Sequence, residues 1–216
     1  MKFKAVLFDL DGTLLDTLAD LADSVNLVLK GHGYPQHDAS AYKYFIGDGI
    51  EKLVERALPE NHREKKTIAS AVEAVKAVYS ANWNKKTRPY GGITELLDRC
   101  RSLGLRLTIL SNKPDEATQK VVAHFFDGIH FDVARGARAD VPKKPDPSAA
   151  LEISRQLNIP PADFLYVGDT GVDMQTAVSA GMYAAGALWG FREAEELISA
   201  GARILVKHPA DLLAWL

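Results

Sequence analysis

The chain has 216 residues, of which 47% are hydrophobic and 25% are charged, and its formal net charge is −2. This length and composition suffice for a sizeable core in one large domain, or in one domain with an insertion. The nearly balanced charge excludes a basic footprint for nucleic acid, and the apolar runs are too short to span a membrane.

The first predicted element is a strand, residues 3–8, that ends at two acidic residues. Its mostly apolar run is typical of a strand buried on both faces of a parallel sheet, and ligands of such sheets bind beyond the carboxyl ends of the strands. Asp9 and Asp11 follow, with Gly12 directly after them. Two such carboxylates repel each other, and a hard metal ion bound between them would remove this repulsion. The other interpretation of Asp9 and Asp11 is an acidic turn exposed to solvent.

The next segment, residues 16–83, is predicted to be helical. Apolar residues recur at helical spacing from Leu18 to Leu29, from Ile50 to Leu58 and from Ile68 to Tyr79. No strand-like run interrupts this pattern. The segment therefore reads as an all-helical insertion after the first strand.

From Pro89 onward, strand and helix patterns alternate, which predicts βαβ units and a parallel sheet. The predicted helices include Asp115–Phe126, Pro147–Leu157 with Asp146 as its cap, and Val172–Ala180. The predicted strands are Leu105–Leu110, Ile129–Ala134, Phe164–Val167, Tyr183–Leu188 and Arg203–Val206.

Polar residues follow several of these strands and predict a binding site at one edge of the sheet. Ser111 and Asn112 follow the first of them and offer a hydroxyl and backbone N–H groups, which suit phosphate oxygens. Asp169 lies at another strand exit. Asp173 lies in the first turn of the next helix, where the helix dipole alone would explain an acid. Lys144, taken alone, is interpreted as a solvated surface residue rather than a site residue.

The single cysteine, Cys100, lies on the apolar face of a predicted helix. It has no second cysteine for a disulfide or a zinc site, so we expect a core residue in a protein of the reducing cytoplasm. The six histidines lack the i, i+4 spacing of a helical zinc pair.

Taken in chain order, the polar segments resemble the four motifs of the haloacid dehalogenase superfamily. These segments are Asp9-x-Asp11-Gly12-Thr13, Ser111, Lys144-Pro145 and Gly168-Asp169-x-x-x-Asp173. The resemblance implies an α/β fold with a Rossmann-like parallel-sheet core, residues 1–15 and 84–216, and a small helical cap, residues 16–83. A narrower resemblance to the phosphoglycolate phosphatase branch rests on Gly47-x-Gly49-x-x-x-Leu53 and on Leu188-Trp189-Gly190-Phe191-Arg192.

This resemblance implies a Mg²⁺-dependent phosphomonoester hydrolase that forms an aspartyl phosphate and acts on a small phosphorylated metabolite, with phosphoglycolate favoured. Asp9 would attack phosphorus, and Asp11 would protonate the leaving alkoxide and then accept a proton from water. Mg²⁺ would bind the Asp9 carboxylate, the Asp11 backbone carbonyl and Asp169, with Asp173 supporting the metal site.

The same resemblance assigns the phosphate contacts. Ser111, the Asn112 backbone N–H and the catalytic Lys144 would hold the non-bridging oxygens and stabilise the charge in transfer.

Other reactions stay open at this stage. A sugar phosphomutase has the same four motifs, and a pyrophosphatase of the same branch fits equally. Asp11 argues against a dehalogenase, because a leaving halide needs no proton, and no cap lysine is marked as the buried amine that a phosphonatase needs. Outside the superfamily, a phospho-acceptor signalling or binding module uses similar parts, although receiver domains are shorter and have no helical cap.

The core motifs treat every ester alike, so we expect selectivity to come from the cap. The turn Gly47-Asp48-Gly49 is predicted to reach the substrate, because two glycines allow close approach of the backbone. Asp48 would disfavour an anionic substrate unless it points away or a neighbouring cation, Lys43, Lys52 or Arg56, neutralises it. An ordinary turn before a helix is the alternative.

Overall fold

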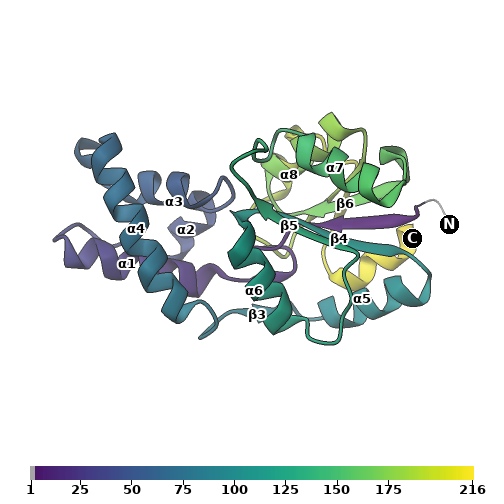
Figure 1. Cartoon of the computed structure of the whole chain (residues 1–216), viewed down its shortest axis with the longest axis horizontal. Helices are drawn as coiled ribbons and strands as arrows, with labels where there is room; N and C mark the ends of the chain where they lie inside the picture. Colours follow the sequence, from purple (N-terminus) through teal and green to yellow (C-terminus); the bar gives the residue numbers. More distant parts are fainter. Residues whose placement is uncertain (1–2) are drawn as a thin grey trace. The chain divides into compact units, whose positions relative to one another are not determined.

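The computed structural model describes residues 3–216, which fold into two compact units. One unit comprises the chain up to Leu15 together with Pro89–Leu216, and the other comprises Asp16–Arg88 (Figure 1). The range predicted for the cap, residues 16–83, falls within the second unit. The independence of core and cap as domains stays a prediction.

The first unit is built on a six-stranded sheet in the order β5-β4-β1-β6-β7-β8, and every neighbouring pair is parallel. Its strands are β1 Ala5–Phe8, β4 Arg106–Pro114, β5 Val133–Ala137, β6 Phe164–Gly168, β7 Tyr183–Ala187 and β8 Ile204–Val206. All four residues of the central strand β1 are buried, as the uninterrupted apolar run predicts. The predicted α/β parallel fold is confirmed.

Two of the strands, β4 and β5, differ from their predicted bounds by more than two residues at an end, whereas the other four differ by one or two. Strand β4 continues past Leu110 to Pro114, and its register against β5 shifts between these two residues. Strand β5 begins at Val133 rather than Ile129, because the Ile129 N–H turns back to the Phe126 carbonyl at 2.9 Å. The residues from 129 to the start of β5 therefore belong to the loop that leaves the preceding helix.

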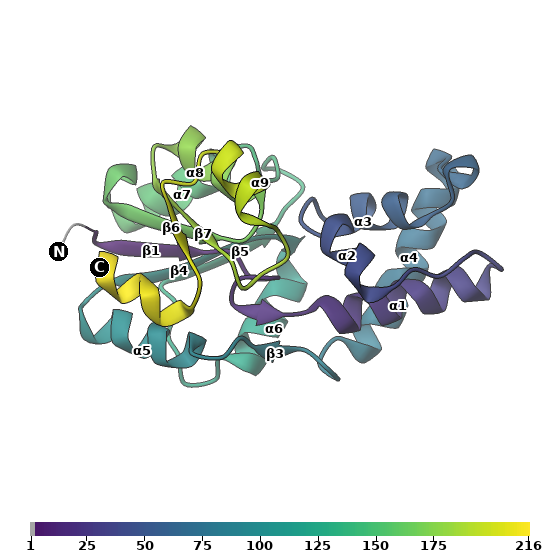
Figure 2. The ribbon, with the colours of Figure 1, turned by 180° about the vertical axis from the view of Figure 1, so that it is seen from behind.

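Helices cover both faces of this sheet: α7 and α8 lie on one face, and α5 and α6 lie on the other (Figures 1 and 2). The helical elements are α5 Ile93–Ser102, α6 Asp115–Phe125, α7 Ser148–Leu157, η2 Pro161–Asp163, α8 Gly171–Ala180, α9 Ala194–Ser199 and η3 Pro209–Trp215. Helix α7 begins one residue later than predicted, but Asp146 accepts the Ser148 N–H at 2.9 Å, so the predicted cap residue does bind the helix start.

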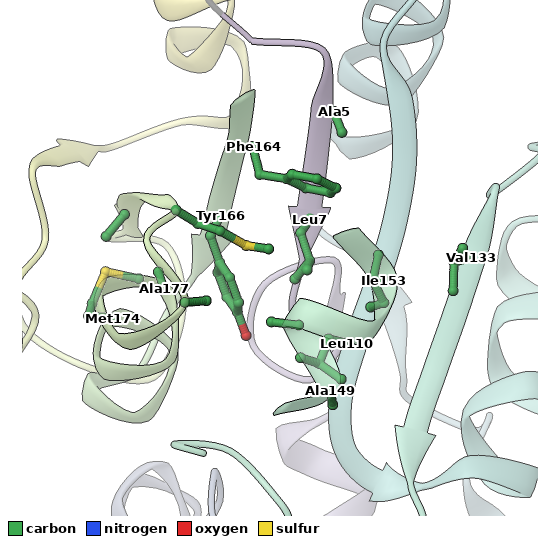
Figure 3. Close-up of a cluster of buried hydrophobic side chains, with 14 of the residues drawn as sticks. Ala5, Leu7, Leu110, Val133, Ala149, Ile153, Phe164, Tyr166, Met174 and Ala177 are labelled. Atoms are coloured by element: carbon green, nitrogen blue, oxygen red, sulfur yellow. The ribbon is translucent and has the colours of Figure 1, made fainter. Parts of the chain in front are cut away.

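A hydrophobic cluster joins β1 and β6 to α7 and α8 (Figure 3). Leu7 and Phe164 come from the two strands, while Ile153 and Met174 come from the helices, and each side chain is fully buried. Burial of a side chain of this size contributes about 1.5–3 kcal/mol relative to exposure. This packing holds the adjacent strands β1 and β6 in place, and with them the carboxylates that follow each strand.

The second unit is helical, with α1 Leu18–Gly31, α2 Ala39–Phe45, α3 Ile50–Ala57, η1 Glu60–His62 and α4 Lys65–Asn82. Two short strands, β2 Leu15–Asp16 and β3 Arg88–Pro89, pair where the chain passes between the units. The buried Asp20 of α1 accepts hydrogen bonds from the Lys86 N–H and from the N–H and hydroxyl of Thr87 at 2.8–3.0 Å. These bonds tie the returning segment to α1, so the compact unit extends to Arg88.

Within the described residues, no helix is both long enough and apolar enough to cross a membrane.

Candidate active site

Asp9 follows β1 at the carboxyl edge of the sheet and is almost fully buried. Its N–H donates to the Val167 carbonyl of β6 at 2.9 Å, which continues the parallel ladder by one residue. Its Oδ1 accepts a bond of 2.7 Å from the Lys144 ammonium. A neighbouring strand and a buried lysine thus fix the position of this carboxylate.

Three buried carboxylates, those of Asp9, Asp169 and Asp173, each offer an oxygen within 4.8 Å of the others. Oxygen donors of this kind are the ligands that hard divalent cations prefer. When all three are ionised, the Lys144 ammonium offsets one of their negative charges and two remain. The donor set and the charge therefore fit a divalent metal ion.

The backbone closes tightly around Asp169. The Thr13 hydroxyl donates to its Oδ1 at 2.9 Å, and the Phe191 N–H donates to its Oδ2 at 2.8 Å. A Cβ added at Gly12 or at Gly190 would lie 2.3 Å from an Asp169 atom, and Gly12 also has a φ of +92°. Both positions need glycine, and the carboxylate is held on both oxygens.

The segment from Leu188 to Arg192, which in the sequence resembles only a narrower branch of the family, packs against the first motif. The Trp189 Nε1–H donates to the Thr13 carbonyl at 2.9 Å. Together with Gly190 and Phe191, this bond makes the segment part of the wall around Asp169. A signal for this role is its place directly after an apolar strand, β7, at the same edge of the sheet.

Asp173 has two functions in the fold. Its Oδ1 accepts a bond of 2.6 Å from Lys144, while its Oδ2 accepts from the Thr170 N–H at 3.1 Å and the Thr170 hydroxyl at 2.6 Å. The Asp173 N–H in turn donates to the Thr170 hydroxyl at 3.4 Å, and this bond forms a capping box with that of the Thr170 N–H at the start of α8. Both interpretations of this acid, helix cap and site residue, are thus compatible with its contacts.

The side chain of Asn112 has a role that sequence reasoning missed. Its Oδ1 accepts the Lys144 N–H at 3.0 Å, and its Nδ2 donates to the Lys144 carbonyl at 3.2 Å. The sequence prediction used only the Asn112 backbone N–H. An amide that offers both a donor and an acceptor can hold another residue's backbone, but residue type alone does not identify the partner.

Burial and mutual repulsion shift the acidities of this group. Burial, reinforced by Asp173, raises the pKa of Asp9 from its ordinary 3.8 to about 7, although Lys144 opposes the shift. Burial also raises the pKa of Asp169 well above its usual range, helped by the charges of Asp9 and Asp173. Burial lowers the pKa of Lys144, but Asp173 and Asp9 outweigh burial and raise it overall. The raised pKa values of Asp9 and Asp169 indicate that the nearby positive charge is too small to offset their burial and their mutual repulsion.

Asp11 lies outside this group of three carboxylates. Both of its carboxylate oxygens contact the Lys113 ammonium, at 2.9 and 2.8 Å. Ser111, the predicted phosphate-binding hydroxyl, is buried in β4 and accepts the Lys113 N–H at 3.1 Å. The contact between Asp11 and Lys113 was not predicted from the sequence.

The predicted selector turn lies in the second unit, between α2 and α3. Gly47 and Gly49 have φ values of 127° and 89°, which favour glycine. Asp48 forms an ion pair of 2.6 Å with Arg56. One of the three expected cations therefore neutralises Asp48, and the approach of this turn to a substrate stays a prediction.

Comparison with known proteins agrees with this geometry. The profile of the haloacid dehalogenase-like hydrolases matches residues 6–187, a range that contains every residue discussed at the carboxyl edge of the core except the segment from Leu188 to Arg192. The chain belongs to this family. The resemblance seen in the four motifs is confirmed.

Several relatives of this haloacid dehalogenase-like hydrolase are named phosphoglycolate phosphatase. The protein of Nitrosospira multiformis is 34% identical over 202 residues, covering 91% of this chain and 88% of the relative. The protein of Aquifex aeolicus is 31% identical over 210 residues, covering 97% and 95%. Together with the family, these relatives identify the chain as a phosphatase.

A solved structure shows the same fold over its whole length. The protein of Lactobacillus delbrueckii subsp. bulgaricus, provisionally named a phosphoglycolate phosphatase, has a TM-score of 0.92 and 32% identity, and the match covers 98% of this chain and 97% of that one. The predicted fold and enzyme class therefore agree with sequence and structure neighbours.

Proposed function

We propose that this phosphatase hydrolyses 2-phosphoglycolate in the presence of Mg²⁺, through an aspartyl phosphate on Asp9. The observation that carries the proposal is the group of three buried carboxylates at the carboxyl ends of β1 and β6, two of which, Asp9 and Asp173, contact the Lys144 ammonium. The names of the relatives support phosphoglycolate as the substrate.

In the proposed first step, an Asp9 oxygen forms a bond to phosphorus as the bond between phosphorus and the ester oxygen breaks. The leaving alkoxide takes a proton from the Asp11 carboxyl group. In the second step, Asp11 accepts a proton from a water molecule, whose oxygen attacks phosphorus and releases inorganic phosphate and the Asp9 carboxylate. The nucleophile is regenerated at the end of each cycle.

Three groups are proposed to hold the phosphoryl oxygens: the Ser111 hydroxyl, the Asn112 N–H and the Lys144 ammonium. Lys144 is held from two directions, through its backbone by Asn112 and through its ammonium by Asp9 and Asp173. A cation fixed before the substrate arrives stabilises transferred charge without reorganisation during the reaction.

The proposed Mg²⁺ ligands are the Asp9 carboxylate, the Asp11 backbone carbonyl and Asp169, with Asp173 as a supporting residue. Asp173 suits the supporting role because a cation, the Lys144 ammonium, already contacts its Oδ1. The donors to Asp169, the Thr13 hydroxyl and the Phe191 N–H, are both neutral and leave its charge available to a metal ion. The bound ion would neutralise the remaining negative charge of the site and of the phosphoryl oxygens.

Substrate choice is proposed to lie with the cap turn Gly47-Asp48-Gly49. The pairing of Asp48 with Arg56 supports this, because a neutralised acid repels an anionic substrate less than a free one. We also propose a cytoplasmic location, which suits a protein whose single cysteine, Cys100, is buried and free.

The decisive experiment measures phosphate release from 2-phosphoglycolate, sugar phosphates, nucleotides and pyrophosphate, first with Mg²⁺ and then with a chelator. We expect the highest kcat/KM for 2-phosphoglycolate and loss of turnover on chelation. The matched control is Asp9→Asn, which should abolish release from every compound. A higher kcat/KM for pyrophosphate, or undiminished turnover with the chelator, would contradict the proposal.

A further inference from the structure

Lys113 forms an ion pair with Asp11, as Lys144 does with Asp9, but it contacts both carboxylate oxygens where Lys144 contacts Oδ1 alone. The Lys113 ammonium contacts both Asp11 oxygens at 2.9 and 2.8 Å, and the two side chains are only 6% and 12% exposed. We propose that Lys113 is a positioning residue, which holds the Asp11 carboxyl group at the site where it transfers protons. This inference rests on the proposed acid–base role of Asp11.

The backbone of Lys113 is itself held in place, which a positioning role requires. Its N–H donates to the Ser111 hydroxyl at 3.1 Å, and its carbonyl accepts from the Thr118 hydroxyl at 3.3 Å. A Cβ at Gly136 would lie 2.6 Å from the Lys113 carbonyl oxygen, so β5 packs closely against this point. The continuation of β4 to Pro114 therefore holds the Lys113 backbone in place, while the two contacts with Asp11 hold its ammonium.

Separate lysines keep the two aspartates in separate roles. Asp9 and Asp11 are two residues apart after the same strand, so an Asp11 carboxylate without its own cation would be attracted to Lys144, where it would compete with Asp9. The contact with Lys113 gives Asp11 a different partner. It also leaves the Lys144 ammonium to Asp9 and Asp173.

Lys113 acts through Asp11 and takes no part in bond making. When the bond between phosphorus and the ester oxygen breaks, the proton that Asp11 accepted from water in the previous turnover passes from its carboxyl group to that oxygen. Asp11 then returns to the carboxylate that pairs with Lys113 in the structure, and Lys113 keeps all of its protons. Loss of the Lys113 ammonium should therefore harm only those reactions that need the Asp11 proton.

The test measures kcat/KM for aryl phosphates whose leaving groups differ in acidity, with Lys113→Met, Asp11→Asn and the double variant. This parameter reports events up to the first cleavage and does not depend on phosphoglycolate being the substrate. We expect Lys113→Met to lower kcat/KM for phenyl phosphate by about tenfold or more, and for p-nitrophenyl phosphate much less, because a stable leaving anion needs little protonation. In the Asp11→Asn background, Lys113→Met should cost nothing further.

Lys207→Met is the matched control, because Lys207 is exposed at the end of β8 and its loss removes the same charge. It should leave every kcat/KM unchanged. Should Lys113→Met not fold, as judged by thermal unfolding, Lys113→Arg provides the comparison: it keeps the charge and should retain more activity on phenyl phosphate than Lys113→Gln. Equal losses for all leaving groups, or a further loss in the Asp11→Asn background, would overturn the positioning role.

A second readout needs no turnover. The NMR signal of the Lys113 ammonium should shift in Asp11→Asn, while a Lys113 signal unaffected by that substitution would also overturn the proposal. If wild-type enzyme cleaves aryl phosphates but not 2-phosphoglycolate, the proposed substrate fails while the leaving-group test of Lys113 still decides.

Discussion

Asn112 holds Lys144 by both polar groups of its backbone, accepting from the N–H at 3.0 Å and donating to the carbonyl at 3.2 Å. The pair joins the end of β4 to the loop before α7. It fixes the lysine whose ammonium lies between Asp9 and Asp173. The side-chain amide of Asn112 thus acts on the proposed phosphate site through Lys144.

Asn112→Ala should lower kcat/KM by a similar factor, about tenfold or more, for every ester, because it frees Lys144 rather than altering proton transfer. Steady-state kinetics with phenyl and p-nitrophenyl phosphate provide the measurement. In a Lys144→Met background, the same substitution should have little further effect on kcat/KM. A loss confined to phenyl phosphate would instead place Asn112 in the proton-transfer machinery.

Asp9→Asn should abolish turnover and stabilise the metal-free protein in a pH-dependent way. The pKa of Asp9 is about 7 in the folded protein against an ordinary 3.8, so between these values the folded state keeps a proton that the unfolded state has lost. The contribution of Asp9 to stability is therefore present below 3.8 and falls as pH rises to about 7. An amide does not ionise.

Urea unfolding of both proteins with a chelator, at several pH values across this interval, measures the effect. The free energy of unfolding of Asp9→Asn relative to wild type should increase with pH and level off above about 7. Added Mg²⁺ should reverse the order by binding wild type more tightly. A difference independent of pH would mean that Asp9 ionises normally in the metal-free protein.

Asp169→Ala and Asp173→Ala should fail in different ways. Asp169→Ala should weaken Mg²⁺ binding more than Asp173→Ala, because Asp169 is proposed to bind the ion directly whereas Asp173 is proposed only to support the site. Removal of Asp173 should cost more stability, since a helix cap contributes about 1 kcal/mol and Lys144 also loses a partner.

Metal titration of activity and thermal unfolding separate these two effects. Thr170→Ala is the matched control, because it removes the other half of the capping box while leaving the Asp173 carboxylate in place. It should lower stability and change Mg²⁺ affinity little. A larger loss of Mg²⁺ affinity in Asp173→Ala than in Asp169→Ala would exchange the assigned roles.

Residues that directly follow a buried strand could be predicted from the sequence. Parallel strands align their carboxyl ends, and the register that pairs Phe8 with Val167 puts Asp9 and Asp169 at the same edge. The apolar run before each acid contains this information. The identity of the sheet edge followed from the same patterns.

Contacts made by side chains in irregular backbone could not be predicted in this way. Asn112 and Lys113 lie where β4 departs from regular pairing with β5, so alternation along the strand no longer tells where each side chain points. The bonds from Asp20 to the returning segment span more than sixty residues and leave no local pattern. Such contacts require the tertiary structure.

Gly47→Val should alter substrate choice if the cap turn contacts the substrate. The φ of Gly47 is 127°, a conformation that valine rarely adopts, so the substitution should displace the turn before α3. We expect a raised KM or a lowered kcat for 2-phosphoglycolate, with hydrolysis of p-nitrophenyl phosphate barely changed, because the latter needs less from the cap.

Gly33→Val is the matched control for strain. Gly33 belongs to the same unit, has a φ of +72° and has no atom within 4 Å of an added Cβ, so this substitution strains the backbone without a clash. Both variants should lose thermal stability, but only Gly47→Val should change the ratio of kcat/KM between the two substrates. Proportional losses on both substrates would assign Gly47 to a structural role. A turn that contacts the substrate should matter more for 2-phosphoglycolate than for p-nitrophenyl phosphate, which needs less from the cap.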